Sequence, residues 1–336
     1  MRILITGNLG YVGTELTKDL NKLGHQVVGV DLNFFKSTLS RKTKIFKQIF
    51  KDFRDINNND LKNVDAIIHL AAVSNDPIGN YFSKITNDIN NKSTVKLAKL
   101  AKKNEIEKFV FASSCSVYGA GGKKLKSEKS SVNPLSSYAK SKISAENSLK
   151  KIKKMSITSL RFATATGFSD NLRLDLVLND FIISALTKKK IEIFSDGKPK
   201  RPLIHIKDMS KAFIWALTRN KKNFLHINVG SNINNFTILG MARKVSKQIP
   251  CEIFVKKFNS NDRRSYAVSF RLYKNIVPKK YHPTENIEKT INQFKNQINK
   301  VDLSKMYNFR KSKYIRLNVL KSMIKKNKIS KNLKWK

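Results

Sequence analysis

Tyr138 and Lys142 are the pair of residues whose types and spacing most directly suggest proton transfer. They stand four positions apart in a segment that opens with Ser136, a suitable helix cap, and continues with apolar residues at helical spacing. Side chains four apart project from one face of a helix. Because an ammonium group beside a phenol favours the phenolate, we expect the pKa of Tyr138 to lie below its free value of about 10. Such a phenol is a general acid or base near neutral pH, a role typically worth about 10²- to 10⁴-fold in rate.

A group of serines just before this helix supplies candidate hydroxyl donors. The apolar run from Phe109 to Ala112 is typical of a buried strand, and Ser113, Ser114 and Ser116 follow it. From the end of that strand, the Ser114 hydroxyl could bridge a substrate oxygen and the Tyr138 phenol. Ser113 and Ser116 compete for this role, and the alternative for Ser114 is a turn serine that caps backbone groups.

The amino-terminal stretch has the spacing of a phosphate-binding turn. The apolar run Ile3 to Ile5 is long enough for a buried strand, Gly7, Gly10 and Gly13 follow at intervals of three, and a helical pattern then runs to Gly24. The glycines therefore lie in the turn from strand to helix. There, free backbone N–H groups and the positive end of the helix face a phosphate, and the missing side chains let it approach.

An acidic residue ends the next apolar run, from Val27 to Val30. Asp31 stands 18 residues after Gly13, about where a dinucleotide site needs an acceptor for the adenosine ribose hydroxyls. This order of elements predicts a dinucleotide site: a strand, a glycine turn, a helix, a second strand and an acidic residue at its end. The carboxylate favours NAD over NADP because it would repel a 2′-phosphate, although Arg41 and Lys42 could weaken that preference.

Strand and helix patterns continue to alternate over the first half of the chain. Further strands are expected at 45–50, 65–72, 109–112 and 156–162, and a helix at 86–103. The alternation predicts an α/β fold with a Rossmann-type, doubly wound parallel sheet. Small residues at the end of the strand at 65–72 would let a cofactor lie against the backbone. His69 in that strand is interpreted as structural, with a catalytic role as the alternative.

The pattern changes after Gly167 and predicts a smaller, mixed C-terminal substrate domain. A helix at 174–186, an extended segment at 202–206, a helix capped by Asp208 and a strand at 225–229 are followed by shorter elements. We assign 1–166 plus about 203–230 to an NAD-binding Rossmann domain, and 167–202 plus 231–336 to a substrate-binding domain. The basic end of the chain keeps Leu317, Leu320 and Ile324 at helical spacing, which favours a docked amphipathic helix over a nucleic-acid tail.

The composition is that of a globular chain with a large positive charge. Of its 336 residues 40% are hydrophobic, and the formal net charge is +43. The lysines are scattered and not interleaved with aromatics, so compositional drift explains the charge better than nucleic-acid binding does. Cys115 and Cys251 are too few for a disulfide framework and lack metal-ligand spacing. Without a long apolar run or room for a signal peptide before the first strand, a cytoplasmic protein with no membrane span is expected.

Taken together, these motifs resemble the extended short-chain dehydrogenase/reductases, and within them the NAD-dependent epimerase/dehydratases of nucleotide sugars. The first half contributes Thr6-Gly-x-x-Gly-x-x-Gly13, Asp31, Asp52, His69-Leu-Ala-Ala72, Ser114 four residues before Tyr118-Gly119, and Tyr138-x-x-x-Lys142. The second half contributes Leu160-Arg161, Asn179, Arg201-Pro-Leu-Ile-His205-Ile-x-Asp208, Asn228-Val-Gly230 and Arg264-Ser-Tyr266.

The resemblance implies a role for each matching residue. Ser114, Tyr138 and Lys142 would be catalytic, and Ser114 would also touch the substrate. The cofactor NAD would be bound by Gly7, Gly10, Tyr11, Val12, Gly13, Asp31, Asp52, Phe53, Leu70, Ala71, Ala72, Tyr138 and Lys142. The diphosphate of a sugar nucleotide would be held by Asn179, Arg201 and Arg264, for which paired arginines are suited. No metal site is expected.

The chain departs from the family pattern beside the catalytic serine. The 4,6-dehydratases carry Asp-Glu after that serine, where this chain has Cys115 and Ser116, which argues against elimination of water. Reductase-epimerases of GDP-sugars place a cysteine at the position of Ser116, so Cys115 does not match them. Thr164, Thr166 and Phe168 also replace residues usual in the family, which leaves the shape of the substrate pocket open.

The leading hypothesis is therefore an NAD-dependent epimerase of a nucleotide-diphosphate sugar that works through a transient keto-sugar and bound NADH. The near alternative is a nucleotide-sugar dehydrogenase, reductase or dehydratase on the same scaffold. An alternative of another class is a non-catalytic NAD-binding protein with nucleic-acid affinity. A homodimer is expected from the resemblance, through the helices at 86–103 and 136–154.

Overall fold

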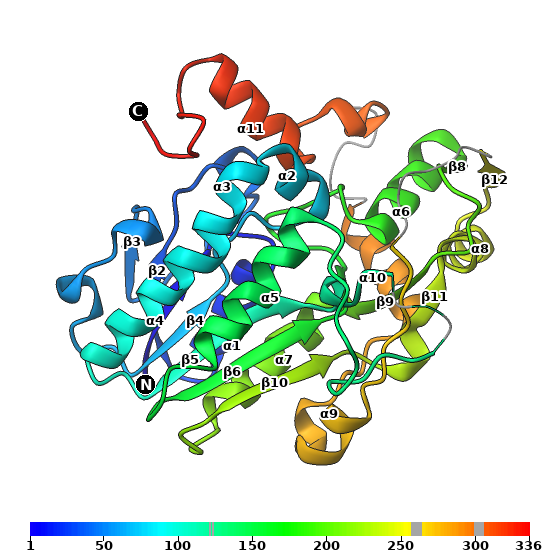
Figure 1. The fold of residues 1–336 in the computed structure, drawn as a ribbon. Helices are drawn as coiled ribbons and strands as arrows, with labels where there is room; N and C mark the ends of the chain where they lie inside the picture. Colours follow the sequence, from blue (N-terminus) through cyan, green and yellow to red (C-terminus); the bar gives the residue numbers. More distant parts are fainter. Residues whose placement is uncertain (121, 123, 257–263, 299–305) are drawn as a thin grey trace.

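A seven-stranded parallel sheet forms the centre of the protein (Figure 1). The computed structural model describes residues 1–120, 122, 124–256, 264–298 and 306–336. The strand order is β10-β6-β5-β4-β1-β2-β3, and every neighbouring pair is parallel. The strands are β1 (Arg2–Thr6), β2 (Gln26–Val30), β3 (Lys47–Ile49), β4 (Ala66–His69), β5 (Lys108–Ser114), β6 (Ser156–Phe162) and β10 (Phe224–Val229). The predicted doubly wound α/β fold is confirmed.

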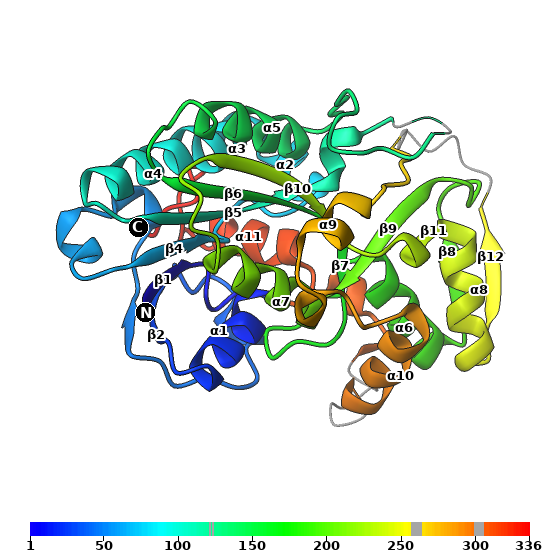
Figure 2. The same ribbon diagram turned by 90° about the horizontal axis from the view of Figure 1, so that it is seen from below.

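Helices cover both faces of this sheet, as the view in Figure 2 shows. One face carries α1 (Gly13–Lys22) and α7 (Ile206–Leu217), which pack on each other. The other face carries α2 (Asp76–Tyr81), α3 (Ser83–Asn87), α4 (Thr94–Lys103) and α5 (Ser137–Leu149). The central strands are therefore apolar on both sides, and Ile3, Leu4 and Ile5 of β1 are fully buried.

The helical segment from Ser83 to Lys103 contains a wide turn. Between α3 and α4, residues Asp88–Ser93 form a π-helical turn, which holds one residue more than an α-helical turn does. Asn90 lies in this turn and is buried. Its amide nitrogen donates to the Val73 carbonyl and to the Ser141 hydroxyl, each at 3.0 Å. The turn thus connects the loop after β4 to α5.

The remaining strands form two smaller sheets in what we call the substrate half. β7 (Thr164–Thr166), β9 (Lys200–His205) and β11 (Asn235–Thr237) make a mixed sheet, and β8 (Lys190–Ile193) pairs with β12 (Glu252–Val255). The helices α6 (Val177–Lys188), α8 (Ile238–Gln248) and α10 (Ile287–Ile298) pack around them with a common apolar core. The short helix α9 (Arg271–Ile276) packs beside β10.

The chain from 306 to 336, which we call the C-terminal arm, connects the two halves. Met306 and Phe309 belong to the core of the substrate half, whereas Leu320, Ile329 and Leu333 belong to the core on the α4 and α5 face of the central sheet. The arm contains the expected amphipathic helix, α11 (Arg316–Lys325). Most of the arm therefore packs on the central sheet and its helices, which differs from our assignment of 306–336 to the substrate domain.

A second difference concerns the start of α7. The N-cap residue is His205, whose Nδ1 accepts a hydrogen bond from the Lys207 backbone N–H, and not Asp208 as expected. The Asp208 carboxylate instead accepts from the backbone N–H groups of Thr284 and Glu285. It therefore connects α7 to the loop before α10.

Within the described parts of the chain, no helix combines the length and apolar character that crossing a lipid bilayer requires. Over the same residues, His, Cys, Asp and Glu side chains form no group of three or more that could hold a metal ion.

Candidate active site

The glycine turn lies between β1 and α1 with close backbone packing. Gly7 has a φ of +78°, and a Cβ atom there would lie 2.9 Å from the Ala71 nitrogen. A Cβ atom on Gly13 would lie only 2.2 Å from the Gly7 carbonyl oxygen. The turn therefore requires glycine at both positions, and it places backbone N–H groups at the amino-terminal end of α1, where an anion is stabilised.

Asp31 follows β2 and lies beside this turn. One carboxylate oxygen accepts the Leu9 N–H at 3.2 Å, and the other accepts the Asn33 N–H at 2.7 Å. Burial raises the pKa of Asp31, and these two hydrogen bonds oppose the rise. Arg41 and Lys42, which could have weakened the preference for NAD, are exposed on the surface and do not line the cavity described next.

Replacing Asp31 by asparagine tests its role in choosing the cofactor. Asparagine keeps the size of the side chain but loses the charge that would repel a 2′-phosphate. A hydrogen bond to a charged group contributes about 1.5–3 kcal/mol, so we expect about a 10- to 100-fold loss of NAD affinity and a smaller loss for NADP. Titration calorimetry with both dinucleotides measures the ratio, and an unchanged ratio would contradict this role of Asp31.

A cavity of about 350 Å³ opens from the glycine turn across the carboxyl ends of the central strands. Its lining includes every residue to which the sequence assigned a catalytic or cofactor-binding role, namely Gly7, Gly10, Tyr11, Val12, Gly13, Asp31, Asp52, Phe53, Leu70, Ala71, Ala72, Ser114, Tyr138 and Lys142. Ligands of open α/β sheets bind at this edge. The structure thus brings these residues together, and their individual roles stay predictions.

The Tyr138 phenol lies in this cavity near the end of β5. Burial raises the pKa of Tyr138 above its ordinary value, and the Asp76 carboxylate raises it further, whereas a hydrogen bond with Ser114 opposes the rise. The expectation of a lowered pKa for Tyr138 therefore does not hold in this structure. The sequence showed the spacing of Tyr138 and Lys142, but not that the phenol would be removed from water.

Lys142 lies one helical turn further along α5. Its ammonium group donates to the Ala112 carbonyl at 2.7 Å and lies 5.7 Å from the centre of the Tyr138 ring. Burial lowers the pKa of Lys142 to about 7, and the Glu146 carboxylate acts in the opposite direction. A lysine with this pKa gains or loses its proton near neutral pH.

The lowered pKa of Lys142 predicts how stability depends on pH. Between about pH 7 and pH 10 the unfolded chain binds a proton at this lysine that the folded protein does not, so the free energy of unfolding rises with pH, by up to about 1.4 kcal/mol per pH unit from this residue. The Lys142→Met variant should lose that slope. Urea unfolding of both proteins at pH 7, 8 and 9 measures it, and parallel slopes would contradict the prediction.

The three candidate serines have different surroundings. The Ser113 hydroxyl donates to Glu146 at 2.5 Å and is therefore used inside the protein. Ser114 caps the following turn by accepting the Ser116 N–H at 3.1 Å, as in the structural alternative, but it also lines the cavity beside Tyr138. The Ser116 hydroxyl lines the cavity as well, and it is buried without a hydrogen-bond partner among the described residues. Ser114 and Ser116 are thus both placed to meet a substrate oxygen.

Cys115 and His69 are structural. The Cys115 thiol donates to the Arg161 carbonyl at 3.1 Å and burial raises its pKa, so it faces away from the cavity and is not a nucleophile. His69 lies between the hydroxyls of Thr6 and Thr94, at 2.7 and 2.9 Å, and burial lowers its pKa to about 3. Its imidazole is therefore neutral and connects β4 to β1 and α4.

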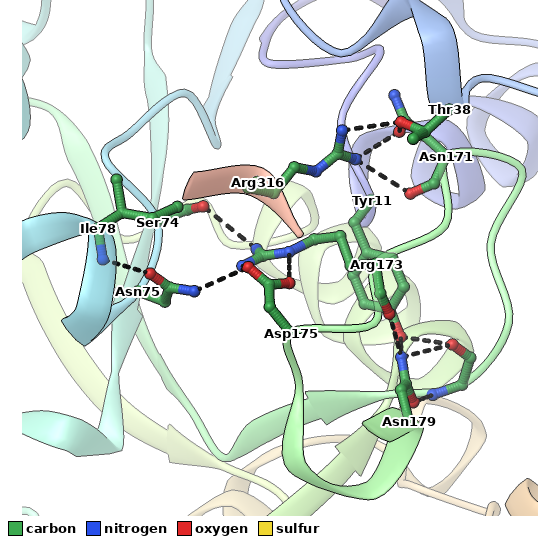
Figure 3. Close-up of polar contacts among 11 residues, drawn as sticks. Tyr11, Thr38, Ser74, Asn75, Ile78, Asn171, Arg173, Asp175, Asn179 and Arg316 are labelled. Carbon is green, nitrogen blue, oxygen red and sulfur yellow. Dashed lines mark hydrogen bonds and ion pairs between the residues drawn. The ribbon is translucent and has the colours of Figure 1, made fainter. Parts of the chain in front are cut away.

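Asn179 lies beneath the surface of the site. Its side chain is fully buried, and it lines neither the cavity described above nor the cavity that Arg201 lines. As Figure 3 shows, its amide group bonds to the Tyr11 hydroxyl at 3.1 Å, to the Arg173 carbonyl at 2.9 Å and to both backbone groups of Gly167. All these bonds are internal. The Asn179 amide thus holds the 167–175 loop against Tyr11, and its expected role at the diphosphate stays a prediction.

Arg201 and Arg264 are close together, as expected for two arginines that share a diphosphate. The Arg201 guanidinium donates to the Arg264 carbonyl and lies 5.2 Å from the centre of the Tyr266 ring. Arg264 forms an ion pair with Asp76, which lines the cavity near Tyr138. Neither arginine lines the cavity itself: Arg264 contacts it only through Asp76, and Arg201 lines a separate cavity in the substrate half. Their role at a diphosphate stays a prediction.

Three arginines that were not predicted line the cavity: Arg54, Arg173 and Arg316. Arg54 is paired with Asp52. Arg173 is paired with Asp175, at 2.9 Å, and donates to the Ser74 hydroxyl at 3.2 Å. Arg316 reaches the cavity from the C-terminal arm (Figure 3). These arginines could not be identified from the sequence, because arginine and lysine are frequent throughout the chain and no local motif marks them.

The sequence model of the NAD dependent epimerase/dehydratase family matches residues 3–230, which include the glycine turn and the Ser114, Tyr138 and Lys142 set. The chain belongs to this family. It is therefore an NAD-dependent enzyme, as the motifs had led us to expect. The glycine turn, which leaves no room for side chains, and the buried carboxylate of Asp31 fit that cofactor.

Relatives of known sequence carry similar descriptions. A Bacillus subtilis protein described as an uncharacterized UDP-glucose epimerase, YtcB, is 32% identical over 246 residues, which are 68% of this chain and 77% of that protein. A putative UDP-glucose 4-epimerase of Methanocaldococcus jannaschii is 28% identical over 68% of this chain and 76% of its own length.

Solved structures share the fold. MoeE5, solved in complex with UDP-glucuronic acid and NAD, matches with a TM-score of 0.78 at 23% identity, over 89% of this chain and 99% of its own. The UDP-glucuronic acid 4-epimerase of Bacillus cereus, solved with UDP-glucuronic acid and NAD, matches with a TM-score of 0.77 at 24% identity, over 90% of this chain and all of its own. About a tenth of the present chain has no counterpart in either structure.

Proposed function

We propose that this protein is an epimerase of a nucleotide-diphosphate sugar. Family membership supports the class of enzyme, and the descriptions of the Bacillus subtilis and Methanocaldococcus jannaschii relatives as UDP-glucose epimerases support the substrate class. The positive charge of the chain favours a substrate that carries phosphates. Which sugar and which base it binds stay open to experiment.

The observation that carries the choice of epimerisation over dehydration lies directly after Ser114. Elimination of water from a sugar requires an acid at the reacting centre, and at this point the chain has a thiol that faces away and a hydroxyl that faces the cavity. The carboxylates that line the cavity are Asp31, Asp52 and Asp76. The first accepts backbone N–H groups beside the glycine turn, and the other two are ion-paired to Arg54 and Arg264.

In this proposal the residues of the chain position the sugar and move one proton. NAD, held by the glycine turn and Asp31, would supply reversible hydride transfer at one carbon of the sugar. The oxidised sugar would turn over in the cavity between the two transfers, so that no net NADH accumulates. Tyr138 removes the proton from the hydroxyl on that carbon through its phenolic oxygen and gives it back. The Ser114 and Ser116 hydroxyls bind the same sugar oxygen, and the Lys142 ammonium stabilises the phenolate. Arg201 and Arg264 hold the diphosphate.

The test is to incubate the purified protein and NAD with a panel of UDP-, GDP- and dTDP-sugars, and to follow the products by chromatography and the absorbance of NADH. We expect two epimers to interconvert from either direction without net NADH. Net formation of NADH with a sugar would indicate a dehydrogenase, and a keto-deoxy product would indicate a dehydratase. Either result, or no turnover by an NAD-loaded protein, would contradict the proposal.

We also propose that the protein forms a homodimer through α5 and the helical segment from Ser83 to Lys103. These helices lie side by side on one face of the central sheet. Light scattering at micromolar concentration should give twice the chain mass of 38.4 kDa, and a monomer would contradict this.

A further inference from the structure

The C-terminal arm forms part of the wall of the NAD cavity. Three of its side chains, Arg316, Leu320 and Leu333, line the cavity together with Asp31 and the residues of the glycine turn. The family match ends at residue 230, so this part of the wall lies outside it. Figure 1 shows α11 and the chain terminus above α2 and α3, at one end of the molecule.

The end of the arm is held at the side of the cavity where Asp31, Asp52 and Phe53 lie. Arg54 donates to the carbonyls of Asn332 and Leu333, each at 2.9 Å. The Trp335 indole N–H donates to the Leu32 carbonyl at 2.9 Å, and its ring meets the Phe34 ring edge-on at 5.1 Å. The contacts join the arm to loops that follow β2 and β3, so the arm is a fixed wall in this structure.

Arg316 lies at the glycine turn. Its guanidinium group lies 4.0 Å from the centre of the Phe35 ring and donates to the Thr38 hydroxyl at 2.9 Å and to the Asn171 carbonyl at 3.2 Å (Figure 3). The Asn171 amide in turn donates to the Leu9 carbonyl at 2.5 Å. One asparagine thus separates the guanidinium from the backbone of the phosphate-binding turn.

The charge of Arg316 has no carboxylate partner. The side chain is only 2% exposed, and over the described residues no carboxylate lies within ion-pair distance of it. Burial and the neighbouring charge of Arg173 lower the pKa of Arg316 to about 9, and the carboxylates of Asp175 and Asp31, which lie beyond ion-pair distance, oppose this shift. A buried cation with no counter-charge in direct contact is costly, and an anion in the cavity beside it would reduce that cost.

We propose that Arg316 binds the diphosphate of NAD and that the C-terminal arm thereby belongs to the cofactor site. The diphosphate is the anionic group of this cofactor, and the glycine turn is the place where such a group is bound. Arginine is suited to it because its planar guanidinium donates two parallel hydrogen bonds to phosphate oxygens. The proposal does not depend on which sugar the enzyme converts.

The test measures the affinity of three ligands for nucleotide-free protein by titration calorimetry: NAD, ADP and adenosine. The Arg316→Met variant keeps an apolar side chain against Phe35 and loses the charge. It should bind NAD and ADP about 10-fold or more weakly than the original chain does. Its affinity for adenosine, which has no phosphate, should be unchanged. The affinities of the Arg316→Lys variant for NAD and ADP should lie between those of Arg316→Met and the original chain. Lysine keeps the positive charge but lacks the planar guanidinium that donates two parallel hydrogen bonds.

Lys325→Met is the matched control, because it removes one positive charge from the exposed side of the same helix. It should leave all three affinities unchanged. Affinities of Arg316→Met for NAD and ADP within twofold of the original would overturn the proposal. An equal loss for adenosine would overturn it as well, since it would mean that the variant only displaces the arm.

A measurement on the unaltered protein keeps the proposal testable if Arg316→Met does not fold. Hydrogen exchange of the amides from 316 to 336 should slow when NAD or ADP binds, and should respond much less to adenosine. If NAD and ADP slow the exchange of these amides no more than adenosine does, the diphosphate does not bind the arm and the proposal is contradicted.

Discussion

The Tyr138→Phe variant should lose about 10²- to 10⁴-fold in turnover while it still binds NAD. Phenylalanine keeps the ring that lines the cavity and removes only the hydroxyl that gives and takes the proton. Because burial and Asp76 raise the pKa of this phenol, the rate of the original enzyme should also rise from neutral toward alkaline pH, by less than the phenol alone would give, since Lys142 loses its charge above about pH 7. The variant should lose this rise. Product formation by chromatography between pH 6 and pH 10 measures both effects.

Two comparisons make the result specific. Tyr81→Phe removes a hydroxyl from an exposed tyrosine on the neighbouring helix α2 and should leave the rate unchanged. Calorimetry with NAD shows whether the Tyr138 variant keeps its cofactor. If Tyr138→Phe turns over at the original rate, another group moves the proton and our assignment of the catalytic residue is wrong.

The second large effect is expected at Glu146, one turn beyond Lys142 on the same face of α5. Its carboxylate is 2% exposed, accepts from the Ser113 and Ser159 hydroxyls at 2.5 and 3.1 Å, and is paired with Arg161 at 2.6 Å. Glu146→Ala leaves the Arg161 charge buried without a partner. Breaking a buried pair in this way costs about 3–5 kcal/mol of the free energy of unfolding, which urea denaturation measures.

A double variant separates the lost pair from the lost volume. In Glu146→Leu/Arg161→Met no uncompensated charge remains, so its stability should lie much closer to that of the original protein than Glu146→Ala does. Glu107→Gln breaks a pair with Lys222 on the surface and should change the stability little. If Glu146→Ala is no less stable than Glu107→Gln, the buried pair is not a stabilising element.

Features that depend on local pattern could be predicted from the sequence. The glycine turn, the strand at Ile3 to Ile5 and the Ser136 cap, which accepts the Ala139 N–H, are properties of a few neighbouring residues. The regular alternation of such elements sets the order of the parallel strands. For this reason the residues predicted to meet at the carboxyl ends of the strands, such as Asp31 and Tyr138, line one cavity.

Features that depend on distant parts of the chain could not be predicted. Arg316 lies at a glycine turn about 300 residues before it, and only the path of the arm brings the two together. Asn179 matched a family motif, but its surroundings are set by the folding of the loop between β7 and α6. The pKa of Tyr138 is set by burial, which the spacing of two residues on a helix does not reveal.

The wide turn at Asp88–Ser93 accommodates one extra residue without changing the face that the rest of the helix presents to the core. Removing one residue there would restore a uniform α-helix, and Leu97 and Ala98 would still face the core. The Asn90 amide, however, would lose its position between the Val73 carbonyl and the Ser141 hydroxyl on α5. We therefore expect related sequences to lack this extra residue only where another side chain makes these two bonds.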